Sequence, residues 1–147
     1  MKISTKGRYA LRLMLDLALQ DPGTFVNLKS IAARQQISVK YLEQLITPLA
    51  KRNLVVSARG TNGGYRLVKK PEAYTVGEIL RATEGSLAPV TCIEGDGNHC
   101  AMTNSCATID LWRDIQKAIN SVIDHQTLAD LVARQKEKCK NQENTPS

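Results

Sequence analysis

The stretch ISVKYLEQLITPLAKRNLV, residues 37–55, decides the fold of this chain. Its apolar side chains recur at positions i, i+3, i+4 and i+7, the spacing of one buried helix face: Leu42, Leu45, Ile46 and Leu49. Ser38 is a suitable N-cap, so we predict a helix from Val39 to about Arg52, bent near Pro48. The opposite face of this helix is polar, so it is not needed for the core and is available to contact a partner.

Two helices are expected before this stretch. The first runs from Thr5 to Leu19 and ends at Asp21-Pro22-Gly23, because proline cannot continue a helix and glycine lets the chain turn. Asn27 caps a second helix, Leu28–Gln35, which a two-residue connection joins to residues 39–52. Short helices, a tight connection and a polar-faced last helix are typical of a helix-turn-helix.

A β-hairpin is predicted directly after the third helix. Residues 54–57 and 65–68 are two β-rich runs separated by the loop ARGTNGG, whose glycines allow a tight turn and whose Arg59 adds a cation. A basic hairpin in this position is the wing of a winged helix. An ordinary glycine-rich turn is the weaker alternative.

Three further helices are expected in the second half of the chain. Thr75 and Glu78 form a capping-box pattern that opens a helix ending near Gly85, and Thr127 opens another helix that runs to about Lys138. Between them, a helix beginning near Ile109 carries a wide apolar stripe of Leu111, Trp112, Ile115, Ala118, Ile119, Val122 and Ile123. We interpret it as a dimerisation helix. The alternative is a helix folded back on its own domain.

The expected fold class is therefore mainly α with a small β-hairpin wing. Residues 1–85 form a winged helix-turn-helix domain, and residues 86–108 form a cysteine-containing loop. Residues 109–138 form the dimerisation helix and a C-terminal helix, and residues 139–147 are a polar tail expected to be disordered.

Charge separates the two halves of the chain. Residues 1–70 hold 13 Lys and Arg against 3 Asp and Glu, and residues 71–147 hold 7 against 11. A basic first half indicates binding to a polyanion, although a solvated basic surface without a partner would have the same composition. No apolar run is long enough to span a membrane, and the charged N-terminus does not resemble a signal peptide. A cytoplasmic protein is expected.

The third helix supplies the candidate DNA contacts. Lys40, Tyr41, Glu43 and Gln44 lie near the end of the helix that approaches base edges in a major groove. Phosphate repels a carboxylate, so Glu43 either discriminates between bases or does not face DNA. Arg59 is expected to reach DNA from the wing, and Arg8 and Lys29 are candidate phosphate contacts.

The segment TCIEGDGNHCAMTNSC, residues 91–106, holds Cys92, Cys100 and Cys106 among loop-forming residues. These spacings are looser than those of a zinc ribbon or of the usual ferredoxins. Three thiolates and one further ligand suit an iron–sulfur cluster, a structural zinc is possible, and free surface thiols are the remaining alternative. Cys139 lies in the polar tail and is interpreted as incidental. His99 and His125 are far apart in sequence and have no catalytic context, so no catalytic residue and no enzyme are predicted.

Several stretches together resemble the Rrf-two family of bacterial winged-helix regulators. They are MKISTKGRYAL, residues 37–55, RGTNGGYRL, VGEILRATEG, the cysteine segment, LWRDI and TLADL, which extend to about Arg134. The resemblance implies a DNA-binding regulator, a homodimer on a palindromic operator, with the helix of residues 110–124 crossing to the partner. It favours the iron–sulfur cluster regulator (IscR) branch, since the cysteine-metabolism branch lacks these thiols.

The resemblance also implies that Cys92, Cys100 and Cys106 hold a cluster, expected to be [2Fe-2S], with [4Fe-4S] and zinc as alternatives. The IscR pattern has a histidine where this chain has Ile109, and another branch has an acidic residue where this chain has Arg8. The fourth ligand is thus unassigned among His99, Asp110, Glu94 and Asp96. The function expected is a dimeric DNA-binding transcriptional regulator whose operator binding is modulated by the cluster. The alternative is the same DNA-binding regulator, such as a redox or cysteine-metabolism repressor, that senses through free thiols or zinc.

Overall fold

The computed structural model describes residues 2–96 and 100–145. Within them the order of elements is α1 (Thr5–Ala18), α2 (Leu28–Gln35), α3 (Val39–Lys51), β1 (Val55–Ala58), β2 (Gly64–Leu67), η1 (Pro71–Ala73), α4 (Val76–Glu84), η2 (Thr91–Ile93), α5 (Ile109–Ile123) and α6 (Leu128–Glu143). The predicted fold class, mainly helical with one hairpin, is confirmed. No helix in these two ranges is long and apolar enough to cross a membrane.

One hydrophobic core joins the first four helices to the wing. Leu13 and Met14 of α1, Ile31 of α2 and Leu45 of α3 are fully buried. Burying each such side chain stabilises the fold by about 1.5–3 kcal/mol, which explains why the spacing in residues 37–55 fixes a helix. Leu128, the first residue of α6, enters the same core, so the C-terminal helix begins against α1 and η1.

Side chains cap the helices as the sequence predicted. Asn27, Ser38 and Thr75 each accept a hydrogen bond from the backbone N–H three residues later. The capping box at Thr75 is only half formed, because Glu78 pairs with Lys69 Nζ at 3.1 Å instead of returning to the Thr75 N–H. The box at Thr127 is complete, with Asp130 as its second member.

The strands of the wing lie one residue from their expected bounds. Val55 pairs with Leu67 and Ala58 with Gly64 in antiparallel register. Leu54 is instead part of the turn after α3, where its N–H donates to the Leu49 carbonyl. At the other end, Gly64 has φ +144° and lies so close to the Val26 carbonyl that a Cβ would overlap it.

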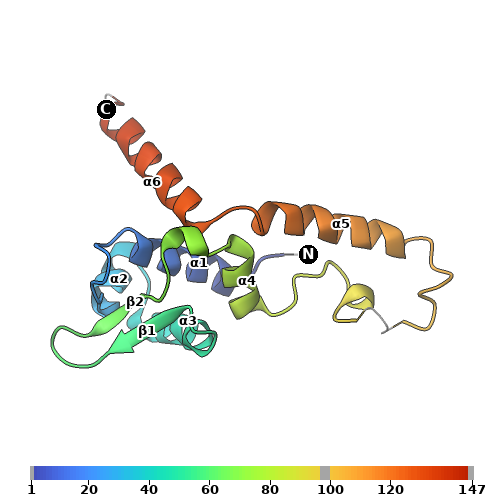
Figure 1. Cartoon of the computed structure of the whole chain (residues 1–147), viewed down its shortest axis with the longest axis horizontal. Helices are drawn as coiled ribbons and strands as arrows, with labels where there is room; N and C mark the ends of the chain where they lie inside the picture. Colours follow the sequence, from blue (N-terminus) through green and yellow to red (C-terminus); the bar gives the residue numbers. More distant parts are fainter. Residues whose placement is uncertain (1, 97–99, 146–147) are drawn as a thin grey trace.

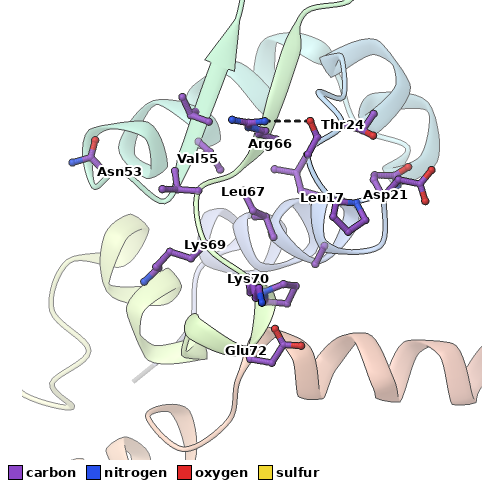
Figure 2. Close-up of a pocket in the computed structure, with 17 residues that line it drawn as sticks. Leu17, Asp21, Thr24, Asn53, Val55, Arg66, Leu67, Lys69, Lys70 and Glu72 are labelled. Carbon is purple, nitrogen blue, oxygen red and sulfur yellow. Dashed lines mark hydrogen bonds between the residues drawn. The ribbon is translucent and has the colours of Figure 1, made fainter.

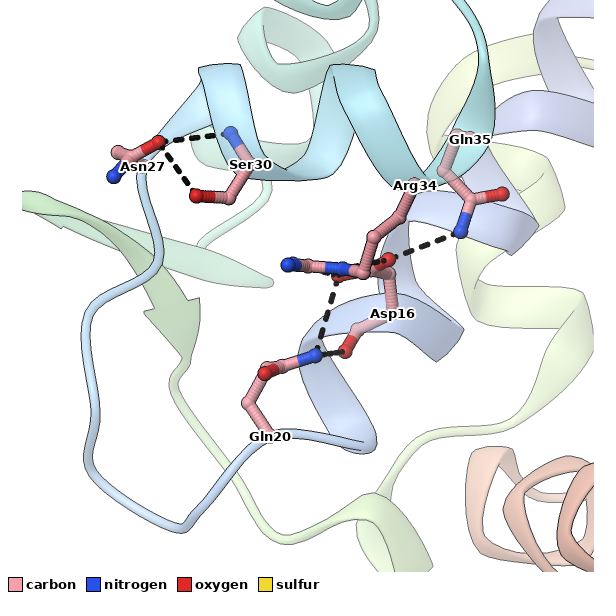
Figure 3. A network of polar contacts seen from close by, with 6 residues as sticks. All are labelled: Asp16, Gln20, Asn27, Ser30, Arg34 and Gln35. Atoms are coloured by element: carbon pink, nitrogen blue, oxygen red, sulfur yellow. Dashed lines mark hydrogen bonds and ion pairs between the residues drawn. The ribbon is translucent and has the colours of Figure 1, made fainter.

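A buried carboxylate fixes α2 against α1. Asp16 is 4% exposed, and Arg34 Nη2 lies 2.7 Å from its Oδ1 while Gln35 Nε2 donates to its Oδ2 at 3.0 Å (Figure 3). Gln20 Nε2 donates to the Asp16 carbonyl. The first two helices therefore meet through a polar network as well as through the apolar core.

The C-terminal half is not packed with the winged helix into one compact body. Figure 1 shows α5 extending away from the winged helix, with η2 beside it and the loop before α5 at its far end, while α6 leaves in another direction. The helix at α6 continues to Glu143, so the expected polar tail is helical over its first residues. Lysine, glutamate and glutamine favour helix even without burial, which accounts for the extension.

Candidate nucleic-acid interface and cysteine loop

The polar face of α3 is free for a partner. Lys40, Glu43 and Gln44 are exposed, while the opposite face of the helix is buried in the core. Thr47 lies one turn further on this face and its hydroxyl donates to the Glu43 carbonyl at 2.9 Å. The structure therefore brings three of the four predicted α3 residues onto one exposed surface.

Tyr41 has a different environment from its three neighbours. Its side chain is half-buried, and its ring meets that of Tyr9 edge to face with 5.9 Å between centroids. The Arg12 guanidinium lies 5.1 Å from the Tyr9 ring centre. Tyr41 thus packs between α3 and α1, a contact that the sequence pattern did not reveal.

The predicted cations lie on different parts of the surface. Arg59 is exposed in the loop of the wing, and Lys29 is exposed in the first turn of α2. Arg8 lines a groove of about 420 Å³ together with Leu80 of α4 and Leu131 of α6. The structure accordingly separates Arg8 from the polar face of α3, because charge alone does not determine on which side of a helix a residue lies.

The three clustered thiols occupy three different local structures. Cys92 lies in η2, Cys100 in the following loop and Cys106 just before α5; all are free and half-buried. Cys106 Sγ lies 3.2 Å from the Thr108 hydroxyl oxygen. Hydrogen bonds from the Thr108 side chain and backbone lower the pKa of the Cys106 thiol, which favours the thiolate that metals and oxidants require.

Apolar packing closes the base of the cysteine segment. Ile93 of η2 is 6% exposed and Ile109 of α5 is 4% exposed, and these two elements are in contact. Ile109 occupies the position at which the family resemblance leads one to expect a histidine. Here that position serves packing, so a ligand is replaced by a hydrophobic contact.

The thiols have the chemistry of cluster ligands, but they are not assembled into a site. Residues 2–96 and 100–145 contain no group of three His, Cys, Asp or Glu side chains placed to hold a metal ion. Among the candidate fourth ligands, Asp110 is 81% exposed on its side chain and lies 3.7 Å from Arg113, and Glu94 is half-buried. Asp96 is exposed, and His99 lies outside the described residues.

Two side chains of α4 connect this helix to α1 and α5. Glu84, the last residue of α4, accepts hydrogen bonds from the Ser4 and Gly7 N–H groups and from the Ser4 hydroxyl, so it caps α1 from outside. Arg81, one turn earlier, contacts Asp124 and Asn120 at the end of α5. Sequence reasoning missed both residues, because neither belongs to a local motif.

The apolar stripe of α5 is partly open to solvent. Leu111 is 51% exposed and Val122 is 56% exposed, while the contacts of α5 are with η2 and α4. The groove beside Arg8 is largely apolar, and Leu11 and Leu15 of α1 line it together with Ile3, which precedes that helix. One chain thus presents both an exposed apolar helix and an apolar groove.

A larger cavity, about 890 Å³, lies between the wing, η1 and the turn after α1 (Figure 2). Its charged groups are mixed in sign and partly satisfied within the chain. Arg66 donates to the Gly23 carbonyl at 3.3 Å and stacks on Phe25, and Lys69 pairs with Glu78. The cavity therefore indicates no single class of ligand.

Comparison with known proteins gives one family. Residues 3–134 match the model of Rrf2, described as an iron-dependent transcriptional regulator. The chain is 43% identical over 135 residues to the HTH-type transcriptional regulator IscR of Yersinia pseudotuberculosis serotype O:1b (strain IP 31758), covering 92% of this chain and 81% of the relative. It is also 43% identical over 133 residues to the HTH-type transcriptional regulator CymR of Bacillus subtilis (strain 168), covering 90% and 91%.

Solved structures show the same two kinds of relative. The global cysteine regulator CymR (YrzC) of B. subtilis superposes with a TM-score of 0.75 at 41% identity, covering 91% of this chain and 98% of that one. T. potens IscR superposes with a TM-score of 0.74 at 39% identity, covering 94% and 90%. Overall similarity therefore does not separate an IscR-like from a CymR-like function.

Proposed function

We propose, from the premise that this chain belongs to the Rrf2 family of transcriptional regulators, that it binds operator DNA as a homodimer and senses its signal through the cysteine loop, residues 91–106. The family assignment makes the chain a regulator and not an enzyme. The exposed polar face of α3 beside a basic wing is the observation that carries DNA binding. Binding to bacterial DNA implies a cytoplasmic protein.

In this proposal α3 enters the major groove and the wing contacts the backbone or the minor groove. Lys40 and Gln44 approach base edges, and Gln44 has the amide needed for a bidentate contact with adenine. Glu43 accepts a hydrogen bond from a cytosine amino group. Where no cytosine is present, repulsion between its carboxylate and the phosphates weakens binding to the DNA. Arg59 and Lys29 neutralise phosphates, which supplies affinity that does not depend on sequence.

Two surfaces that complement each other support the homodimer. The exposed stripe of α5, with Leu111 and Val122, docks in the groove that Leu11, Leu15 and Leu131 line in a second copy. Such an exchange is symmetric, so each copy both gives and receives a helix. A two-fold dimer presents two α3 helices to a palindromic operator.

For the cysteine loop, the leading proposal is that Cys92, Cys100 and Cys106 hold an iron–sulfur cluster, expected to be [2Fe-2S], with [4Fe-4S] as the alternative type. When bound, such a group supplies a redox-sensitive centre. The lowered pKa of Cys106 supports this assignment, because metal coordination requires thiolates. The loop contains η2, which contacts α5, and it ends just before that helix, so a rearrangement of the loop moves the helix that joins the two copies.

A second candidate is a regulator that senses through the free thiols themselves or through zinc. Two observations favour it. The three thiols are not gathered into a metal-binding group within the described residues. The B. subtilis relative CymR, described as a global cysteine regulator, is as similar to this chain as IscR is.

Metal analysis separates the two candidates. Protein purified without oxygen is expected to show visible absorption and to contain iron and acid-labile sulfide, and Cys92→Ala, Cys100→Ala and Cys106→Ala should each remove the absorption. Cys139→Ala, on exposed α6, is the matched control and should retain it. Colourless protein after supply of iron and sulfide would contradict cluster binding, and zinc alone would support the second candidate.

Salt-dependent binding to duplex DNA tests the interface. Arg59→Ala should weaken binding about tenfold and reduce the slope of log K against log salt by about one, because one phosphate contact is lost. Arg134→Ala removes an exposed arginine of α6 and should change neither quantity. If the two variants changed the affinity and the salt slope equally, the wing would not be part of the DNA interface.

A further inference from the structure

Tyr74 closes the base of the wing. Its side chain is fully buried, and its hydroxyl donates to the Leu54 carbonyl at 2.6 Å while it accepts from the Val68 and Lys69 N–H groups at 2.9 and 3.0 Å. Leu54 directly precedes β1, and the other two residues directly follow β2. One hydroxyl thus holds both legs of the hairpin where they meet the body of the protein.

The backbone around Tyr74 is paired with the junction between α5 and α6. The Tyr74 carbonyl accepts from the Leu128 N–H at 2.9 Å, and the Val76 N–H donates to the Gln126 carbonyl at 2.9 Å. Thr75 forms an antiparallel bridge with Thr127 between these two bonds. The residue that fixes the wing is therefore also part of a short ladder to the end of α5.

Arg81 fixes the last turn of α5 to the same region. Its Nη1 lies 2.6 Å from Asp124 Oδ1, and its Nη2 donates to Asn120 Oδ1 at 2.8 Å. A Cβ at Gly77 would overlap Asp124 Oδ1 and Arg81 Nη1, so the first turn of α4 approaches this ion pair as only glycine permits. A displacement at the end of α5 must move residues 74–77 or break these bonds.

The wing has a second attachment that does not lead to α5. Val26 exchanges two backbone hydrogen bonds of 2.8 Å with Tyr65, which ties β2 to the segment before α2. The ion pair of Lys69 with Glu78 also reaches α4, but both side chains are more than one-third exposed, so its contribution is small. Among the hydrogen bonds of the described residues, those of Tyr74 are the buried ones that connect the wing to the α5–α6 junction.

We propose that Tyr74 is a positioning residue for DNA binding: it sets the wing relative to α3 and passes displacements of the end of α5 to the wing base. The inference rests on the proposed function, in which Arg59 of the wing contacts DNA and α5 responds to the cysteine loop. It adds the path between them: the buried bonds of Tyr74, the backbone ladder to residues 126–128 and the partly exposed ion pair of Arg81 with Asp124 are contiguous.

Amide hydrogen exchange of the free protein tests the first half of the proposal without DNA. In Tyr74→Phe the ring still fills the core, but the Val68 and Lys69 N–H groups lose their acceptor and should exchange about tenfold faster. Exchange in α3 should stay unchanged. Tyr65→Phe is the matched control, because no hydrogen bond of the Tyr65 hydroxyl is found in the described residues. Unchanged exchange at Val68 and Lys69, or loosening of α3 as well, would overturn the positioning role.

Transmission is tested from the other end, with Tyr74 in place. Asp124→Ala releases Arg81 and should speed exchange at Val68 and Lys69, whereas Asp114→Ala, an exposed carboxylate of the same helix, should not. Combined with Tyr74→Phe, Asp124→Ala should add no further change at the wing base. The proposal is wrong if Asp124→Ala leaves exchange at Val68 and Lys69 unchanged. It is also wrong if Asp124→Ala speeds that exchange equally in the natural chain and in Tyr74→Phe.

Duplex binding completes the test. Arg59→Ala should weaken binding about tenfold in the natural chain and less than about twofold in Tyr74→Phe, because a wing that is no longer positioned has already lost that contact. Additive losses would overturn the link between Tyr74 and the wing's DNA contact. If the natural chain binds no duplex at all, the proposed function fails, and the exchange measurements decide on their own whether Tyr74 positions the wing.

Discussion

Asp16 carries a carboxylate into the interior of the helix-turn-helix. Arg34 and Gln35 satisfy its two oxygens from α2, so the angle between α1 and α2 depends on a hydrogen-bonded ion pair (Figure 3). The same contact raises the pKa of Arg34 and keeps the guanidinium charged. Because α2 packs on α3, the network indirectly sets where the polar face of α3 points.

Asp16→Asn should lower the free energy of unfolding by about 2–3 kcal/mol, since Arg34 loses its charge partner and the buried site loses an acceptor. The Arg34 side chain is 42% exposed, so water compensates part of the loss and the effect stays below that of a fully buried pair. Urea denaturation measures it. Asp21→Asn, at an exposed position in the next turn, should change stability by less than about 0.5 kcal/mol; a similar loss there would contradict the assignment.

Local sequence patterns predicted some of the site residues and missed others. Lys40, Glu43 and Gln44 could be placed on one exposed face because helical periodicity fixes which positions share a face. Tyr41 differs because its neighbour Tyr9 is 32 positions away, and no local pattern encodes that contact. Tyr74 and Glu84 were missed for the same reason: their partners are set by the packing of distant segments.

Among the elements, α4 connects three other helices. It packs on α1 and α3, holds the end of α5 through Arg81 and caps α1 through Glu84. A carboxylate at the first N–H groups of a helix is favoured by the helix dipole, and α1 has no acidic residue in its own first turn. Glu84 provides that charge from another helix, and a Cβ at Gly7 would overlap it.

The contact between α4 and α5 should depend on acid pH. Arg81 lowers the pKa of Asp124 below its ordinary value of 3.8. A carboxyl whose folded pKa is depressed stabilises the folded state above that ordinary value and loses the contribution as pH falls through the folded pKa. Asp124→Asn should therefore reduce the thermal stability at pH 7 and reduce it less near pH 3. An equal effect at both values would show that the charge of Asp124 is not involved.

Elements were predicted well where their own residues decide them. The bounds of α2 and the caps at Asn27 and Ser38 follow from local side-chain chemistry. The capping box at Thr75 is half formed because Lys69, from the end of the wing, competes for Glu78. The strands of the wing differ by one residue from their predicted bounds. The Val68 N–H donates to the Tyr74 hydroxyl and the Leu54 N–H donates within the turn after α3, so neither residue pairs in the sheet.

At the scale of the whole molecule, one chain has two apolar surfaces that its own packing leaves exposed. The winged helix has a closed core, whereas α5 extends from it with an uncovered apolar face (Figure 1). Exposed apolar stripes of this kind mark interfaces in proteins. The groove formed by α1, α4 and α6 has the complementary character, and in the proposed homodimer a second copy covers both surfaces.

Leu111→Asp should convert the dimer to monomers, raising the dissociation constant at least about 100-fold, because the interface would bury an unpaired charge. An aspartate in the first turn of α5 is compatible with the helix dipole, so the helix itself should persist. Sedimentation velocity measures the change. Leu19→Asp, at another exposed leucine outside α5 and the groove, is the control and should stay dimeric. A dimer in both variants would place the interface elsewhere.

The sequence by itself determined the winged helix, the presence of a free apolar helix and the three thiols between them. These features depend on periodicity, caps and residue chemistry within short windows, which act before distant segments meet. Only the tertiary structure decided that Arg8 lies beside α6, that Ile109 packs with the base of the cysteine segment, and that Tyr74 joins the wing to the end of α5. Each of these is a contact between segments far apart in the chain, and such contacts depend on how the elements pack.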